Sequence, residues 1–236
     1  MSHKKSNSPY NLLAQSYDES TNLAIFNIYK SMIGEVGKQR ILDLGCGTGM
    51  LLEHYSSNNE TYGIDESPEM IKIARGRDKN TDYSIGNIRD FKMDKKFNLI
   101  VCAYDTINHL PTIKDWNKLF KNVANHLDDD GIFIFDFVTP QGFKNYGGYT
   151  SFTKIGDDYL IKQVESKDKV CHWEIHSFTK TSKTSYNHQK AIVKEYTFLK
   201  EAVIQKIKTY FTIVKIQKEK NNRLIIKTRK KRLYSY

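Results

Sequence analysis

Between residues 40 and 138, short runs of apolar and β-branched residues alternate with longer stretches whose apolar residues recur at helical spacing. This alternation is typical of βαβ units around a parallel sheet, so we predict an α/β fold for this region. The predicted strands are 40–44, 61–64, 81–85, 97–103 and 131–138, and the predicted helices are 10–17, 23–33, 49–56, 68–75 and 113–127. The aspartate-rich segment 128–131 is predicted to be a turn.

From about residue 149 the apolar residues recur with period 2 instead, which indicates an antiparallel meander. Its predicted strands are 158–165, 170–179 and 191–198, and they are followed by a helix over 199–209 and two strands, 211–217 and 223–228. We expect this last pair to form a hairpin that rejoins the first sheet. Residues 1–140 and 199–236 then form one domain, and residues 141–198 are an insertion in it.

The chain has 236 residues with a formal net charge of +10, and the charge is unevenly distributed. Residues 1–140 hold 16 basic and 19 acidic residues, whereas residues 141–236 hold 21 and 8. The basic half could be a surface for nucleic acid or for an acidic substrate. However, 30 of the 37 basic residues are lysine, and the forked guanidinium of arginine suits phosphate and base recognition better.

Three widely spaced cysteines favour neither a disulfide framework nor a metal-ligand motif. The first residues contain no apolar signal-like run, and no stretch approaches the 18 apolar residues of a membrane span. We therefore expect a cytoplasmic protein that does not interact with membranes.

A glycine-rich turn follows the first predicted strand in the run Asp43-Leu44-Gly45-Cys46-Gly47-Thr48-Gly49. Glycines without Cβ atoms can adopt positive φ and let a ligand approach the backbone, and the next helix begins with free amide donors. The dinucleotide motif G-x-G-x-x-G would need glycine at Met50, and the lysine of a P-loop is absent. A pyrophosphate ligand is therefore disfavoured.

Asp65 ends the second predicted strand, 20 residues after Gly45. The carboxyl ends of neighbouring parallel strands face one crevice, so this carboxylate should lie beside the glycine turn. There it can accept hydrogen bonds from both hydroxyls of an adenosine ribose.

These residues carry a family resemblance. The glycine turn, together with Gly63-Ile64-Asp65-Glu66-Ser67-Pro68, resembles class I S-adenosylmethionine-dependent methyltransferases. Gly86-Asn87-Ile88-Arg89-Asp90 resembles the adenine-contacting segment of that family, and the run 97–105, which includes Tyr104, resembles its fourth-strand motif. With the early tyrosines and the late insertion, the whole pattern is similar to the amino-sugar N-methyltransferases.

The resemblance implies a Rossmann-like, seven-stranded, mostly parallel sheet with helices on both faces, a reversed terminal hairpin and an antiparallel β insertion before the last helix. It implies S-adenosyl-L-methionine as cofactor, with the loop around Gly45 on the methionine amino group and Asp65 on the ribose. The residues expected to bind the cofactor are Tyr17, Asp43, Gly45, Cys46, Gly47, Asp65, Glu66, Asn87, Ile88 and Tyr104. Relatives often have Asp at position 87 and an apolar residue at position 66.

The methyl group of this cofactor is already activated, so the protein mainly has to orient the acceptor. A base is needed only for a protonated acceptor, and His109, in the segment after the fourth strand, is the candidate because imidazole titrates near neutral pH. It could equally fill space at a helix end. Tyr10 and Tyr17 lie two helical turns apart, so they should share one face of a helix. The resemblance implies that this helix forms a lid over the cofactor.

His172, Glu174 and His176 alternate along a predicted strand and should project from one face of it. They could bind a metal or an acceptor, or they could simply be the solvent side of a half-buried strand; we predict no metal site. His188 precedes the last meander strand and could point into the pocket.

The main functional hypothesis is methyl transfer to a small-molecule nitrogen or oxygen, with the insertion as acceptor lid or as the surface of a homodimer. Lysines of the meander would favour an anionic acceptor. Two alternatives stay open: an RNA methyltransferase that uses the basic half, and a protein that binds the cofactor without transferring methyl. The amino-purine methyltransferase signature is missing, because Tyr104-Asp105-Thr106-Ile107 stands in its place, so nucleic acid is disfavoured.

Overall fold

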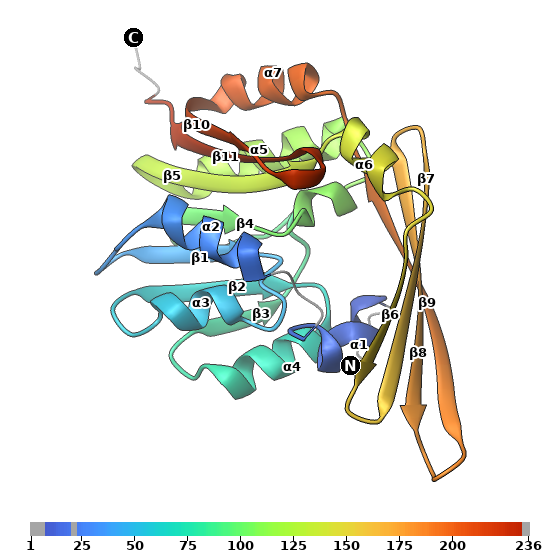
Figure 1. Cartoon of the computed structure of the whole chain (residues 1–236). Helices are drawn as coiled ribbons and strands as arrows, with labels where there is room; N and C mark the ends of the chain where they lie inside the picture. The colour runs from blue at the N-terminus through green and yellow to red at the C-terminus, as the bar shows by residue number, and fades with distance from the viewer. Residues whose placement is uncertain (1–7, 20–22, 233–236) are drawn as a thin grey trace.

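A computed structural model describes residues 8–19 and 23–232, which form two β-sheets with helices packed around the larger one (Figure 1). The larger, sheet A, has seven strands in the order β10-β11-β5-β4-β1-β2-β3. Its strands are β1 (Arg40–Leu44), β2 (Glu60–Asp65), β3 (Asp82–Ile85), β4 (Phe97–Cys102), β5 (Leu127–Val138), β10 (Phe211–Lys218) and β11 (Arg223–Lys230). Strands β1 to β5 are mutually parallel, while β11 runs antiparallel to β5 and pairs with β10 in the terminal hairpin. The predicted α/β fold with a reversed hairpin is confirmed.

Helices cover both faces of sheet A. They are α2 (Leu23–Ile33), α3 (Met50–Tyr55), α4 (Pro68–Arg77), α5 (Ile113–His126) and α7 (Lys200–Tyr210). Side chains of α5 and α7 pack with one face of the sheet around the fully buried Trp116 and Phe133. Side chains of α2, α3 and α4 pack against the other face around Tyr29 and Leu52. Burial on both faces explains why these strands are near-continuous apolar runs.

Sheet B consists of β6 (Thr150–Ile155), β7 (Asp158–Lys167), β8 (Val170–Lys180) and β9 (Tyr186–Tyr196), all antiparallel. It stands to one side of the α/β layers, beside the N-terminal helix (Figure 1). Sheet B lies in the chain between β5 and α7, within the segment predicted to be an insertion. The assignment of residues 141–198 to an insertion within one domain remains a prediction.

The N-terminal segment lies between sheet B and α4. Leu13 and Ala14 are buried together with Met70 of α4 and with Ile175 and Val193 of sheet B. The segment is not the single helix predicted for 10–17. It is divided into α1 (Tyr10–Leu13) and a 3₁₀ turn, η1 (Ala14–Ser16), because the chain packs onto two different elements here.

Other elements also differ from the sequence prediction. Segment 128–131 is not a simple turn, because β5 already begins at Leu127, which pairs with Phe97, and a bulge with Asp130 at φ 65° carries the strand on. Helix α6 (Pro140–Tyr146) and strand β6 were not predicted. Strand β9 begins at Tyr186 and not at 191, since pairing with β8 extends through residues too polar to show an apolar alternation.

Within residues 8–19 and 23–232, no helix is long and apolar enough to cross a membrane. The amino-terminal residues in which the sequence lacks an apolar run lie outside the described part of the chain. A cytoplasmic location stays a prediction.

Candidate active site

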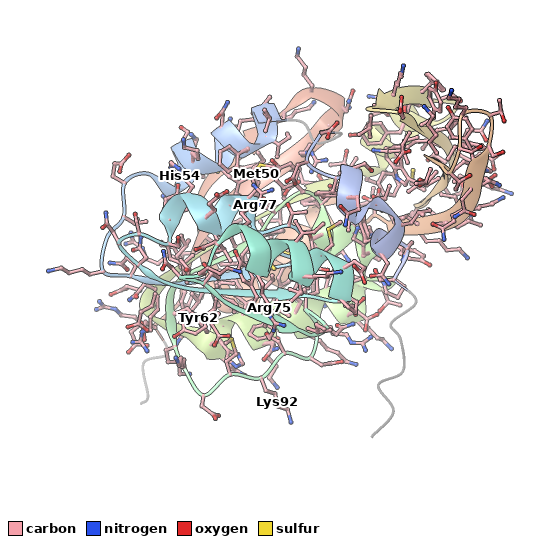
Figure 2. All side chains as sticks on the ribbon, turned by 90° about the horizontal axis from the view of Figure 1, so that it is seen from below. Met50, His54, Tyr62, Arg75, Arg77 and Lys92 are labelled. Carbon is pink, nitrogen blue, oxygen red and sulfur yellow. The ribbon has the colours of Figure 1, made fainter. Side chains whose placement is uncertain are left out.

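The glycine turn connects β1 to α3, whose first residue, Met50, is labelled in Figure 2. Gly45 and Gly47 have φ of +76° and +53°, in the left-handed region that favours glycine. A Cβ atom added at Gly45 would lie only 2.3 Å from Cγ2 of Thr106. The Gly45 amide donates to the Ile64 carbonyl at 2.7 Å, which fixes the turn against the end of β2. The first glycine is therefore required both by its conformation and by the close approach of the loop after β4.

Asp65 stands at the end of β2 and faces the glycine turn, as predicted. Its Oδ2 accepts the Gly47 amide at 2.9 Å, and its Oδ1 accepts the Ser67 amide at 2.8 Å. Burial raises the pKa of Asp65, and these two backbone hydrogen bonds oppose the rise. Each carboxylate oxygen can accept a further hydrogen bond, so hydroxyl groups of a ligand could still be bound.

A cavity of about 190 Å³ opens over the glycine turn. Nine of the predicted residues line it: Tyr17, Gly45, Gly47, Asp65, Glu66, Asn87, Ile88, Tyr104 and His109. It is also lined by Ser8, Tyr10, Met70, Arg89, Thr106, Leu110 and Pro111. The structure thus brings the carboxyl ends of β1, β2 and β4 and the N-terminal segment around one cavity.

Asp43 and Cys46 do not line this cavity. Asp43 is buried beneath the turn, and its Oδ1 has no hydrogen-bond partner among the described residues. Burial and the nearby Asp65 raise the pKa of Asp43 to about 7. The Cys46 thiol is buried too and contacts the Gly47 carbonyl oxygen at 3.9 Å, while the Cys46 amide donates to the Ile64 carbonyl at 3.0 Å. From the sequence alone, residues that support the turn, such as Asp43, could not be distinguished from residues that face the cavity.

Asn87 and Glu66 face each other at the outer rim of the cavity. The Asn87 side-chain amide donates to Glu66, and its Oδ1 accepts the Arg89 amide at 2.8 Å. The oxygen predicted to read an adenine amino group therefore already caps a turn, and a ligand would bind through its second lone pair.

His109 lies in the 3₁₀ turn η2 (Thr106–His109) and contacts Tyr10 from the N-terminal segment. The Tyr10 hydroxyl lies 2.9 Å from Nε2 of His109, and Nδ1 lies 3.4 Å from the Lys194 carbonyl oxygen. A carbonyl oxygen only accepts, so Nδ1 carries the hydrogen and Nε2 accepts from Tyr10. Burial lowers the pKa of His109, so the imidazole is neutral at pH 7.

A buried ionic network fixes the loop between β4 and η2. Arg223 of β11 pairs with Asp136 of β5 and, at 3.0 Å, with Asp105. Asp136 also accepts the hydroxyl of Tyr29 and, at 3.0 Å, the backbone amide of Asp105. Tyr104 and Asp105 both have φ near +55°, an unfavourable conformation that this network stabilises. The network therefore sets the position of Tyr104 and of the turn that carries His109.

A second charged cluster fixes the other side of the glycine turn. Thr48 donates to Asp18 at 2.5 Å, and Arg77, labelled in Figure 2, pairs with Asp18 and, at 3.1 Å, with Glu53 of α3. These contacts attach the segment that follows Tyr17 to the turn.

A larger cavity, about 1020 Å³, adjoins the first and lies between sheet A and sheet B. Tyr10, Tyr17 and Tyr104 line both cavities. The second is further lined by Asp105 and Arg223 from the network and by inward-facing residues of sheet B, among them Lys162, Trp173, Ile175, Val193 and Glu195. The sequence predicted an acceptor lid here but not this chamber, although Trp173 and Ile175, which alternate on β8 and line it, were the signal.

The opposite face of β8 carries His172, Glu174 and His176. His176 contacts Glu174 at 2.8 Å and His188 at 2.8 Å, and this group faces away from the chamber. His188 thus points outward and not into the pocket. Among the described residues no group of three or more His, Cys, Asp or Glu side chains could hold a metal ion.

The smaller cavity suits an adenosine-type ligand with a cationic substituent. Glycines without side chains border it, the Asp65 carboxylate faces it, and the buried Asp43 beneath the turn has an oxygen without a partner in the described structure. The larger chamber begins at the three tyrosines and leaves room for a second molecule.

Residues 41–131 match the family model described as a methyltransferase domain. The chain has the fold of solved S-adenosylmethionine-dependent methyltransferases, to which it is similar over most of its length. A solved S-adenosylmethionine-dependent methyltransferase from Clostridium acetobutylicum superposes with a TM-score of 0.78 at 22% identity, covering 93% of this chain and 98% of that one. An amino pentose methyltransferase from Micromonospora echinaspora superposes with a TM-score of 0.73 at 16% identity, covering 92% and 95%. At these identities the superpositions establish the fold.

The amino-sugar relatives match less than half of this chain. A dTDP-3-amino-3,4,6-trideoxy-α-D-glucopyranose N,N-dimethyltransferase of Streptomyces venezuelae is 31% identical over 104 residues, 44% of this chain and 43% of the relative. A malonyl-[acyl-carrier protein] O-methyltransferase of Bacillus cereus is 26% identical over 213 residues, 79% of this chain and 75% of the relative. The chain thus spans less than half the length of the amino-sugar enzymes in these matches.

Proposed function

We propose that the protein transfers a methyl group from S-adenosyl-L-methionine to a nitrogen or oxygen atom of a small molecule. The observation that carries this proposal is the junction of the two cavities at Tyr10, Tyr17 and Tyr104. A cofactor over the glycine turn would direct its methyl group toward an acceptor in the larger chamber. The named activities of the relatives, which methylate sugar amines or a malonyl group, support the same reaction type.

In this proposal, the glycine turn and Asp65 hold the cofactor. Gly45 and Gly47 allow the methionine part to lie on the backbone, and Asp65 accepts hydrogen bonds from the ribose. Asn87 and the Ile88 amide bind the adenine edge, and Glu66 lies at the rim. Asp43 supports the turn from below. When bound, the cofactor supplies the activated methyl group.

Tyr10 and His109 would orient the acceptor and receive its proton. The Tyr10 hydroxyl lies at the junction and donates to the neutral His109. A proton from the acceptor would pass to Oη of Tyr10 while the Tyr10 hydrogen passes to Nε2 of His109. Positioning supplies most of the remaining rate enhancement, because the methyl group is already activated.

Sheet B would form the acceptor wall of the active site. Its inner face lines the chamber. Lys162 of β7 and Lys220 of the turn before β11 provide positive charge in the chamber that could bind an anionic part of the acceptor. The outer face of sheet B exposes Phe152 and Ile192, so a homodimer through this face is an additional proposal.

The test uses two reactions, each with the protein and methyl-labelled S-adenosylmethionine. One contains fractionated metabolites and the other contains total RNA. We expect label in a small molecule only. Label confined to RNA would contradict the acceptor class, and cofactor binding without label transfer would favour a binding protein.

Cofactor placement is tested by titrating S-adenosylhomocysteine into Asp65→Ala in a calorimeter. We expect binding weaker by about 2 kcal/mol, since hydrogen bonds to a charged group are lost. The exposed Asp94→Ala is the control and should bind as the wild type. Unchanged affinity of Asp65→Ala would mean that the ribose lies elsewhere.

A further inference from the structure

Glu195 is a buried acidic side chain in the chamber that the proposed function does not yet use. It lies on the inward face of β9, is only 5% exposed and lines the larger cavity. Its Oε2 atom has no hydrogen-bond partner among the described residues. A buried carboxyl oxygen without a partner is costly, and a ligand that binds to it is one explanation for its presence.

Among the described residues Glu195 forms no ion pair. Arg223 is already shared between Asp105 and Asp136, and Lys162 and Lys220 line the same chamber without pairing with Glu195. Burial, followed by the charge of Asp105, raises the pKa of Glu195 to about 8, while the Trp173 indole and Arg223 oppose the rise. The surroundings therefore favour the arrival of a positive charge beside Glu195.

Glu195 also lies next to the proposed reaction centre. The carbonyl of the preceding residue, Lys194, contacts His109, and Tyr10 lines the same chamber as Glu195. Burial raises the pKa of the Tyr10 hydroxyl, and the charges of Tyr17 and then Glu195 raise it further. A molecule bound to Glu195 would thus place an atom within reach of Tyr10.

The indole ring of Trp173 lines the chamber beside Glu195. It lies on the inward face of β8, next to Tyr146. A carboxylate next to an aromatic ring is suited to an ammonium group, which gains both an ion pair and a cation–π contact. A hydroxyl group would gain neither contact.

We propose that Glu195 is the acceptor-binding carboxylate and that it selects an amine as the methyl acceptor. The amine enters the chamber as an ammonium ion and pairs with Glu195, whose carboxyl proton leaves to solvent. The ammonium then gives one proton to Oη of Tyr10 while the Tyr10 hydrogen passes to Nε2 of His109, and the neutral amine accepts the methyl group. This inference rests on the proposed methyltransferase function and narrows it from a nitrogen or oxygen acceptor to an amine.

The first experiment tests the acceptor class. A fractionated metabolite pool is divided in two, and the amines of one half are blocked with the N-hydroxysuccinimide ester of acetic acid. Both halves are incubated with the wild-type protein and methyl-labelled S-adenosylmethionine. We expect incorporation to fall at least tenfold in the blocked half. Equal incorporation in both halves would overturn the selection of an amine, whereas no incorporation in either half would instead contradict the proposed function on which it rests.

The second experiment tests the residue. Glu195→Gln keeps the shape and removes the charge, and we expect at least a tenfold loss of incorporation with unchanged affinity for S-adenosylhomocysteine. Glu174→Gln, the same change on the outer face of sheet B, should behave as the wild type. Glu195→Asp keeps the carboxylate and should retain more activity than Glu195→Gln. Wild-type activity of Glu195→Gln, or equal losses in the Gln and Asp variants, would overturn the role of the charge.

Discussion

The hydroxyl of Tyr10 lies 2.9 Å from Nε2 of His109, although 99 positions separate the two residues in the chain. The N-terminal segment is brought there by packing between α4 and sheet B, and η2 presents the imidazole from the other side. The pair stands where the two cavities meet, and its chemistry therefore depends on three separate parts of the fold.

Removing the Tyr10 hydroxyl should slow methyl transfer. If the pair relays a proton, Tyr10→Phe and His109→Gln should each lower the turnover by about 100-fold, the lower end of the usual general-base contribution. The double variant should be no slower than the slower single variant, because the two residues act as one unit. Turnover is measured with labelled cofactor, and Tyr186→Phe, an exposed position on sheet B, serves as the control. If the loss of turnover in the double variant equals the product of the two single losses, the residues act independently and do not form a proton relay.

The turnover should also fall at acid pH. Because burial lowers the pKa of His109, the imidazole remains neutral from alkaline pH down to below its ordinary value of 6.5. Activity should therefore be lost only as the pH falls through this lowered pKa, and protonation then removes the acceptor lone pair on Nε2. A rate profile from pH 5 to 8 measures this. A midpoint above 6.5 would exclude His109 as the group responsible.

A methyl group at Gly45 should destabilise the protein. Gly45→Ala places a Cβ atom 2.3 Å from Thr106 Cγ2 in a residue with φ of +76°, and we expect a loss of at least about 2 kcal/mol in unfolding free energy. Gly76→Ala is the matched control, because Gly76 lies in α4 with no atom within 4 Å of the added Cβ. It should stabilise the protein by about 0.5 kcal/mol. Urea denaturation measures both, and equal stabilities would contradict the close approach of the two loops.

Breaking the buried network should be costly. Arg223→Met leaves the fully buried Asp136 without its counterion, and we expect a loss of about 3–5 kcal/mol. The double variant Arg223→Met with Asp136→Asn should recover part of this loss, because no uncompensated charge then remains at position 136. Unfolding free energies are measured by urea denaturation. If the loss in the double variant equals the sum of the losses in the two single variants, the two residues do not stabilise each other.

The buried Asp43 should make stability depend on pH in a defined direction. Its pKa is about 7 in the folded protein and 3.8 as the ordinary value, so the folded state holds the proton more tightly. This contribution is fully present below pH 3.8 and is lost as the pH rises through 7. The stability of the wild type relative to Asp43→Asn should therefore decrease between pH 4.5 and 8, whereas the exposed Asp94→Asn should leave the slope unchanged.

Most of sheet A could be predicted from the sequence because its strands are buried on both faces and its turns have distinctive chemistry. The capping Ser67, whose Oγ accepts the Met70 amide at 3.2 Å, and Pro68 marked the start of α4 correctly. Strand β6 and the first part of β9 were missed because their residues are mostly exposed. Their conformation is set by pairing with β7 and β8, and no local periodicity reports it.

The candidate site, too, was predicted from the sequence only in part. The spacing from Gly45 to Asp65 was sufficient to place both residues at one cavity, because parallel strands must end at the same edge of the sheet. The spacing could not show that Asp43 and Cys46 lie beneath the turn, or that His172 and His188 lie on the outer face of sheet B.

The amino-acid sequence by itself determined the α/β fold, the glycine turn and the acidic residue beside it, since each depends on local periodicity and short-range backbone chemistry. Only the tertiary structure decided that Tyr10 meets His109 and that Glu195, rather than the histidines of β8, faces the chamber. The reason is physical: which face of sheet B is buried depends on what it packs against, and the N-terminal segment that it packs against is more than 140 residues distant in the chain.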